Sequence, residues 1–184
     1  MNPDPEKGIE CYVDADFAGR WNQEEGKDPV LVLSITEYVI IYSNCPIIWA
    51  SRIQTKIELK KIEVEYIALY QAMRYVLPFV SLMKETEFII KLQGDAPTLL
   101  CSLFEKLVTP ITVYEENQVA TELAVSPQIW TCTKHIDIKY NQLQIFVANG
   151  DQKNVNIKEQ ITDIFKNPLD SELFGYLRYK LNSR

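Results

Sequence analysis

A short acidic strand near the start of the chain places the tightest constraint on the fold. In this segment Ile9, Cys11 and Val13 alternate with more polar residues, and Asp14 closes the run before a turn that contains Gly19. Since successive side chains of a strand point to opposite faces, the three apolar residues share one face and Asp14 lies on the other. A single Asp at the end of a strand is most often a turn former.

Three further acidic residues stand in comparable positions. Glu65 lies in a helical pattern, Glu116 follows a short strand pattern, and Asp163 lies near the start of a later helical pattern. Four carboxylates delivered from separate elements to one place are a usual way to hold divalent metal ions. Asp16, two residues beyond Asp14, is interpreted as a turn residue.

The pattern downstream of the first strand predicts a hairpin and then a crossover. Two β-rich runs, residues 38–42 and 47–51, flank Ser43–Pro46, and Asn and Pro in that segment supply turn geometry. A strand, two helices, a short strand and two more helices are expected at residues 111–114, 119–124, 136–147, 155–157, 161–166 and 172–181. This order predicts a mixed sheet with helices on its faces.

The longest helical pattern lies between the hairpin and the fourth strand. Glu65 lies beside its apolar stripe, and Ala68 and Ala72 allow a close approach to a sheet, which would aim Glu65 inward. Pro78 is expected to bend or break the helix because it removes a backbone donor. The apolar stripe consists of Ile62, Tyr66, Leu69, Met73, Val76 and Val80.

Composition narrows the class of protein. The chain of 184 residues is expected to form one domain, with an N-terminal tail at 1–8 and a C-terminal helix at 170–184. No apolar run approaches the roughly 20 residues of a membrane span, so we expect an intracellular protein, cytoplasmic or nuclear, that is not secreted. The net charge of −6 argues against a whole-surface nucleic-acid binder, although an enzyme with a local basic patch remains compatible. The four cysteines are interpreted as buried reduced thiols, and the tryptophans as packing residues.

Several ordered motifs carry a family resemblance. They are Cys11–Gly19, Cys45–Ser51, Glu63–Leu69, Thr133–Tyr140, Lys158–Gln160, Asp163–Ile164 and Asn167–Leu169. Together they resemble the ribonuclease H domain of copia-type LTR retrotransposon polyproteins, over nearly the whole chain. The resemblance implies a ribonuclease H-like α/β fold with a central mixed five-stranded sheet flanked by helices.

The resemblance also implies an activity, cleavage of the RNA strand of an RNA–DNA hybrid with two Mg²⁺ (or Mn²⁺) ions. The implied catalytic and metal-binding residues are Asp14, Glu65, Glu116 and Asp163. The candidate substrate-binding residues are Arg52, Lys134, His135 and Lys139. The expected partner is the hybrid, with no membrane, and protein partners are not specified.

Some positions depart from the family pattern. Glu116 replaces an Asp, Lys60–Ile62 replaces small hydroxyl residues before the helix Glu, and Asn141 replaces a His. The segment Ser34–Glu37 has lost a cation and a glycine. Two hypotheses therefore stand: an active nuclease, and a catalytically impaired descendant that binds nucleic acid or another protein.

Overall fold

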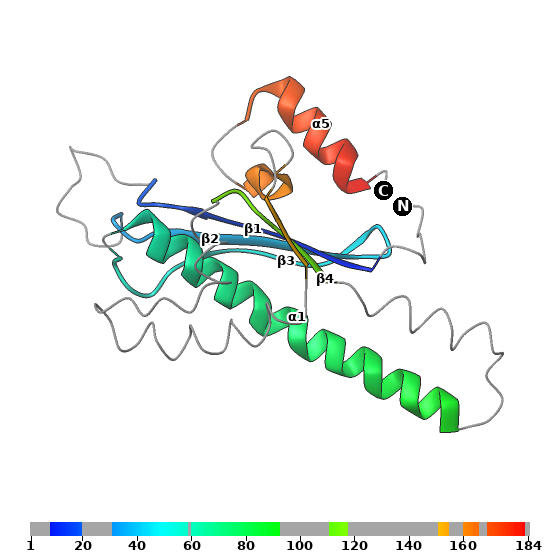
Figure 1. Ribbon diagram of the computed structural model, residues 1–184. Coiled ribbons are helices and arrows are strands. Elements are labelled where there is room, and N and C mark those ends of the chain that lie inside the picture. Colours follow the sequence, from blue (N-terminus) through cyan, green and yellow to red (C-terminus); the bar gives the residue numbers. More distant parts are fainter. Residues whose placement is uncertain are drawn as a thin grey trace.

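A computed structural model describes residues 8–19, 31–58, 60–92, 111–117, 151–154, 160–165 and 169–182 (Figure 1). Several sequence predictions lie outside these ranges. They are the helices at 119–124 and 136–147, the strand at 155–157, and the residues Trp21, Cys101, Trp130, Cys132, Lys134, His135, Lys139 and Asn141. Within the described ranges, no helix is both long and apolar enough to cross a membrane.

The described strands form one mixed sheet in the order β3-β2-β1-β4-β5. β1 pairs antiparallel with β2 and parallel with β4, β2 pairs antiparallel with β3, and β4 pairs parallel with β5. The predicted mixed α/β architecture is therefore confirmed. The strands are β1 (Ile9–Asp16), β2 (Ile35–Tyr42), β3 (Cys45–Ile53), β4 (Ile111–Glu115) and β5 (Asp151–Asn154).

The predicted hairpin is β2–β3, joined by a two-residue turn. Ser43 and Asn44 have φ values of 49° and 66°, the left-handed pair that matches the twist of a tight hairpin. β3 begins at Cys45 and so includes Pro46, earlier than expected. Since β3 is the outermost described strand on its side, the missing N–H of Pro46 is tolerated there.

The long helix α1 (Lys61–Leu92) covers one face of the sheet (Figure 1). Its predicted stripe is confirmed, because Leu69, Val76 and Val80 are buried in one core with Val13 and Tyr38. Ala68 and Ala72 are also fully buried where the helix approaches the strands.

Of the bend or break expected at Pro78, the break is wrong, because α1 continues through this residue. Pro78 itself is exposed, while Val76 and Val80 on either side of it are buried against the sheet. Packing on both sides of the proline therefore outweighs the loss of one backbone hydrogen bond.

The 3₁₀ helix η2 (Ile161–Phe165) and the helix α5 (Ser171–Asn182) cover the opposite face. Ile161 packs there with Tyr12 and Val39, and the Tyr12 ring stacks on Tyr114 with 4.4 Å between ring centroids. Both elements match predicted helices, the first as a short 3₁₀ segment. The Asp170 carboxylate accepts hydrogen bonds from the first backbone N–H groups of α5, which caps that helix.

The two faces confirm the alternation predicted for β1. Ile9, Cys11 and Val13 lie in the core beneath α1, whereas Tyr12 lies in the core beneath η2. The Cys11 thiol is free and its pKa is raised by burial, as expected of a structural thiol.

The apolar stripe of α1 is expected to carry much of the stability of the fold. Leu69 is 1% exposed and Leu82, on the same helix, is 58% exposed. Leu69→Ala should lower the free energy of unfolding by about 2–5 kcal/mol, since it leaves a cavity in the core. Leu82→Ala is the matched control and should change it by less than about 0.5 kcal/mol. Urea denaturation followed by circular dichroism measures both, and equal effects would contradict the packing of α1 on the sheet.

Candidate functional site

Three buried carboxylates approach one another where β1 and β4 end and α1 begins. Asp14 lies near the end of β1, Glu115 is the last residue of β4, and Glu65 lies in the second turn of α1. Each is at most 2% exposed. Because β1 and β4 are parallel neighbours, with Val13 paired to Glu115, their carboxyl ends meet at the same edge of the sheet.

Glu115 is a residue that sequence reasoning missed. Glu116 was expected at this corner, but it follows the strand and is only half-buried, whereas Glu115 is buried. Val113 and Glu115 share the face of β4 that is turned toward α1, because side chains alternate along a strand. The signal was available in that alternation, since Glu115 continues the buried series of Val113.

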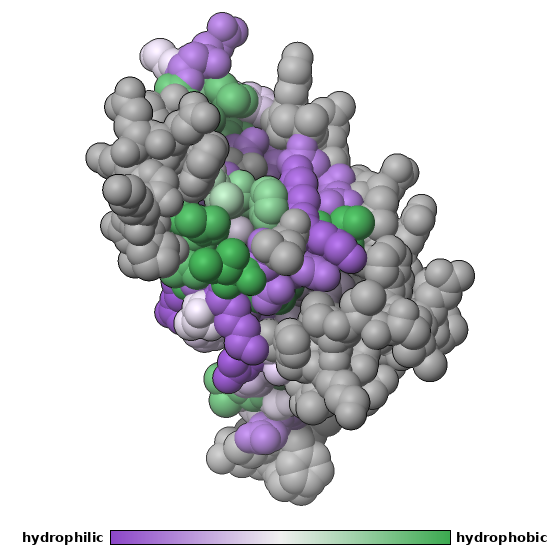
Figure 2. Space-filling model, turned by 90° about the vertical axis from the view of Figure 1, so that its left-hand side faces the viewer, coloured by the Kyte–Doolittle hydropathy of each residue, from purple (hydrophilic) through white to green (hydrophobic). Residues whose placement is uncertain are grey.

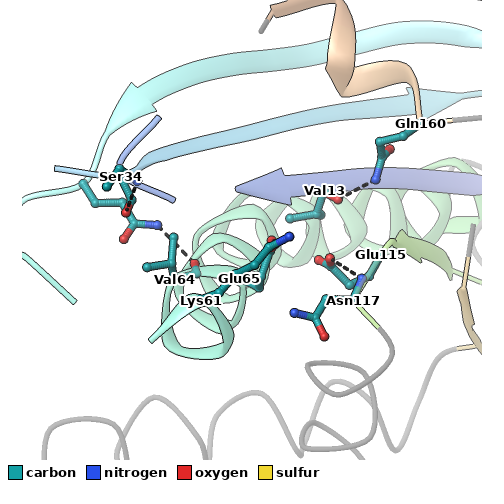
Figure 3. Close-up of polar contacts among 10 residues, drawn as sticks. Val13, Ser34, Lys61, Val64, Glu65, Glu115, Asn117 and Gln160 are labelled. Atoms are coloured by element: carbon teal, nitrogen blue, oxygen red, sulfur yellow. Dashed lines mark hydrogen bonds and ion pairs between the residues drawn. The ribbon is translucent and has the colours of Figure 1, made fainter. Parts of the chain in front are cut away.

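The electrostatics of Glu115 show how closely the three carboxylates interact. Its pKa is raised well above the ordinary value of 4.5, first by burial and then by the negative charge of Glu65, with a smaller contribution from Asp14. The backbone N–H of Asn117 partly offsets this by donating to Glu115 Oε1 at 3.1 Å (Figure 3). Glu115 Oε2 is buried and accepts no hydrogen bond from the residues that the structure describes.

Lys61, an exposed lysine, contacts one of the three buried carboxylates. Lys61 Nζ lies 3.8 Å from Glu65 Oε1, one helical turn along α1. The Lys61 side chain is 64% exposed, whereas that of Glu65 is 2% exposed. Figure 3 shows the two side chains lying together at the start of α1, on the side nearer Glu115.

Glu37 is a second residue that sequence reasoning did not place at the site. It is buried and pairs directly with Asp14 in the β1–β2 register, so the two carboxylates share one face of the sheet. Ser51 Oγ donates to Glu37 Oε1 at 3.1 Å from β3. The sequence signal was again a strand alternation, in which Glu37 continues the buried series of Val39 and Ile41.

Two buried glutamines fix the elements that carry the site. Gln54 Nε2 donates to Thr36 Oγ1 at 3.0 Å and to the Val64 carbonyl at 3.1 Å, which ties β2 to the first turn of α1 next to Glu65. Gln160 Nε2 donates to the Val13 carbonyl at 2.8 Å, which ties the start of η2 to the residue before Asp14 (Figure 3). The bonds to the Val64 and Val13 carbonyls place Glu65 and Asp14 through their neighbours in the chain.

Asp163 and Asp16 are less buried than Asp14, Glu65 and Glu115. Asp163 is half-buried in η2, on the face of the sheet opposite α1. Asp16, predicted as a turn residue, is the last residue of β1, and its carboxylate lies so close to Gly19 that a side chain there would clash with it. Ala18, with φ of 49°, completes this turn by donating its N–H to Ser34 Oγ at 3.2 Å.

The donor chemistry suits a hard cation, but the described residues alone do not form a complete ligand set. Buried carboxylate oxygens that repel one another are the ligands that Mg²⁺ and Mn²⁺ prefer. Among the described residues, however, no three His, Cys, Asp or Glu side chains form a ready ligand set for a metal ion. The structure brings Asp14 and Glu65 together with Glu115, whereas the predicted set with Glu116 and Asp163 stays a prediction.

The surface beyond the carboxylates is mixed in character. Figure 2, which views the side where α1 begins, shows apolar surface residues beside hydrophilic ones. Arg52, a predicted substrate contact, is exposed and donates to the Tyr75 hydroxyl at 2.8 Å. Trp49 is 61% exposed on β3, so its interpretation as a packing residue is wrong.

The pKa of Glu115 predicts a pH dependence of stability. Because the folded chain keeps the Glu115 proton to a higher pH than the unfolded chain does, this contribution is fully present below pH 4.5. It is lost as the pH rises through the raised folded-state pKa. Glu115→Gln should therefore raise the free energy of unfolding at pH 7, on the order of 1 kcal/mol, and flatten its fall above pH 4.5. Urea denaturation across this pH range measures the effect.

The adjacent Glu116→Gln is the control for that measurement. Glu116 is half-buried and should give a pH profile close to that of the unaltered chain. If Glu116→Gln, and not Glu115→Gln, flattened the profile, the assignment of the buried carboxylate would be reversed.

Comparisons with known proteins point to retroelements. The chain is 26% identical over 175 residues to the "Retrovirus-related Pol polyprotein from transposon RE1" of Arabidopsis thaliana. It is 25% identical over 162 residues to the "Retrovirus-related Pol polyprotein from transposon TNT 1-94" of Nicotiana tabacum. These matches cover 94% and 88% of this chain but 10% of each polyprotein. No protein-family model matches the chain.

Proposed function

We propose that this chain is a retroelement-derived ribonuclease H-like domain that cleaves the RNA strand of RNA–DNA hybrids with the help of divalent metal ions. The observation that carries the proposal is the group of buried carboxylates, Asp14, Glu65 and Glu115, at the carboxyl ends of two parallel strands. The similarity to retrotransposon Pol polyproteins supports the same class of function.

The fold supports this proposal through the place of β1. This strand lies between β2 and β4, with helices on both of its faces, as the ribonuclease H-like architecture inferred from the sequence motifs requires. Asp14 therefore projects from the most constrained strand of the sheet. A carboxylate fixed by a buried strand holds its position well enough for chemistry that tolerates little displacement.

The acidic residues of the chain are expected to bind the metal ion in this reaction. Asp14 and Glu65 would hold the cation, together with Glu116 and Asp163 from the motifs or with Glu115 from the structure. Bound Mg²⁺ or Mn²⁺ supplies Lewis acidity and an activated water for phosphodiester hydrolysis. Burial of the carboxylates keeps bulk water away and strengthens their interaction with a cation.

A catalytically impaired descendant is the second candidate function. Specific observations favour it: the described residues hold no ready ligand set for a metal ion, and Lys61 already contacts Glu65. Such a descendant would retain the fold and bind nucleic acid or another protein without cutting.

Cleavage of a labelled RNA–DNA hybrid separates the two candidates. The purified chain is expected to cut the RNA strand in Mg²⁺ or Mn²⁺. Asp14→Asn should reduce the rate by about 10²-fold or more, because it removes the charge of the most constrained ligand. Asp170→Asn is the matched control, since Asp170 is an exposed helix cap that Asn can replace.

The opposite result would be absence of cleavage at high protein concentration together with no rise in melting temperature on addition of metal. That result would support the impaired descendant, and a gel-shift measurement with the uncut hybrid would then show whether nucleic acid still binds. In an active protein, comparing Glu115→Gln with Glu116→Gln identifies which glutamate serves the reaction.

A further inference from the structure

We propose that the Lys61 ammonium is a built-in counter-ion of the buried carboxylates, which weakens the affinity of this site for divalent cations. The inference rests on the proposed function for the identity of the site, but it concerns cation binding and not cleavage. Its residue is the first of α1, and its partner Glu65 lies one turn further along the same helix.

The geometry gives the lysine access from solvent to a buried group. Lys61 Nζ lies 3.8 Å from Glu65 Oε1, while 64% of the Lys61 side chain remains exposed. A lysine can lay its stem along the protein and keep its charged end hydrated, so the cost of placing this charge is small. The position of Glu65 is in turn fixed, because Gln54 bonds to the carbonyl of the preceding residue.

The charge of Lys61 is expected to act on more than Glu65 alone. The negative charges of Glu65 and Asp14 both act on Glu115, so both contribute to the repulsion at that residue. A positive charge beside one of them lowers the repulsion in the whole group. A divalent cation entering the same group would meet the repulsion of the ammonium.

The size of this effect can be estimated from Coulomb's law. A charge of +1 and a charge of +2 held about 5 Å apart change a binding constant by about fivefold, for the dielectric constant of bulk water that suits an exposed ammonium and for physiological salt. An ordinary exposed pair on a helix would behave differently. Lysine preceding glutamate by four residues is the weaker order for such a pair, and its loss changes stability little and metal binding not at all.

The test is the affinity of the full chain for Mn²⁺ in the absence of nucleic acid. Isothermal titration calorimetry and the melting temperature with and without Mn²⁺ provide two readouts. Lys61→Ser is expected to bind Mn²⁺ about fivefold more tightly than the unaltered chain. Addition of Mn²⁺ should also raise the melting temperature of this variant by more than it raises that of the unaltered chain. Lys61→Arg keeps the charge and should behave like the unaltered chain.

Lys84→Ser is the matched control, because Lys84 is exposed on the same helix and its replacement makes the same change in net charge. Equal Mn²⁺ affinities for Lys61→Ser and Lys84→Ser, or no binding by either, would overturn the proposal. Tighter binding by Lys61→Ser alone supports it. If that variant binds Mn²⁺ more tightly and no protein cuts the hybrid, the counter-ion role stands and the proposed nuclease activity fails.

Discussion

The rest of the structure depends on the position of β1 between β2 and β4, with both faces covered. Apolar residues on one side of β1 enter the core beneath α1, and Tyr12 enters the core beneath η2. A polar side chain near the end of such a strand has little solvent to face. Asp14 is therefore buried because of the topology, and Glu37 is buried beside it because β2 pairs in register with β1.

Burial of several carboxylates in one region is unfavourable, because their negative charges lose hydration and repel one another. Glu115 shows it directly, since burial and the charges of Glu65 and Asp14 raise its pKa. Hydrogen bonds from Asn117 to Glu115 and from Ser51 to Glu37 offset part of this cost. A proton, a metal ion or a nearby ammonium can offset the rest of the cost.

The sequence predicted those features that depend on local periodicity. The alternation in β1, the β2–β3 hairpin, the stripe of α1 and the inward aim of Glu65 all follow from spacings of two or of three and four. The break expected at Pro78 does not occur, because the packing of α1 on both sides of the proline outweighs the one backbone hydrogen bond that proline removes. Glu115 and Glu37 continue alternations that are visible in the sequence, but which strand faces are covered depends on strands that meet only in three dimensions.

The choice between a working nuclease and a folded descendant reduces to what balances the charge of these carboxylates. A site that depends on metal leaves its repulsion unbalanced until the ion binds, and so gains affinity from that repulsion. In this chain Lys61 contacts Glu65, one of the residues proposed to hold the cation. Under the proposed function, the same ammonium that eases folding of the acidic region is expected to oppose binding of the metal ion on which cleavage would depend. Stability without metal and affinity for metal are thus expected to change in opposite directions at this one residue.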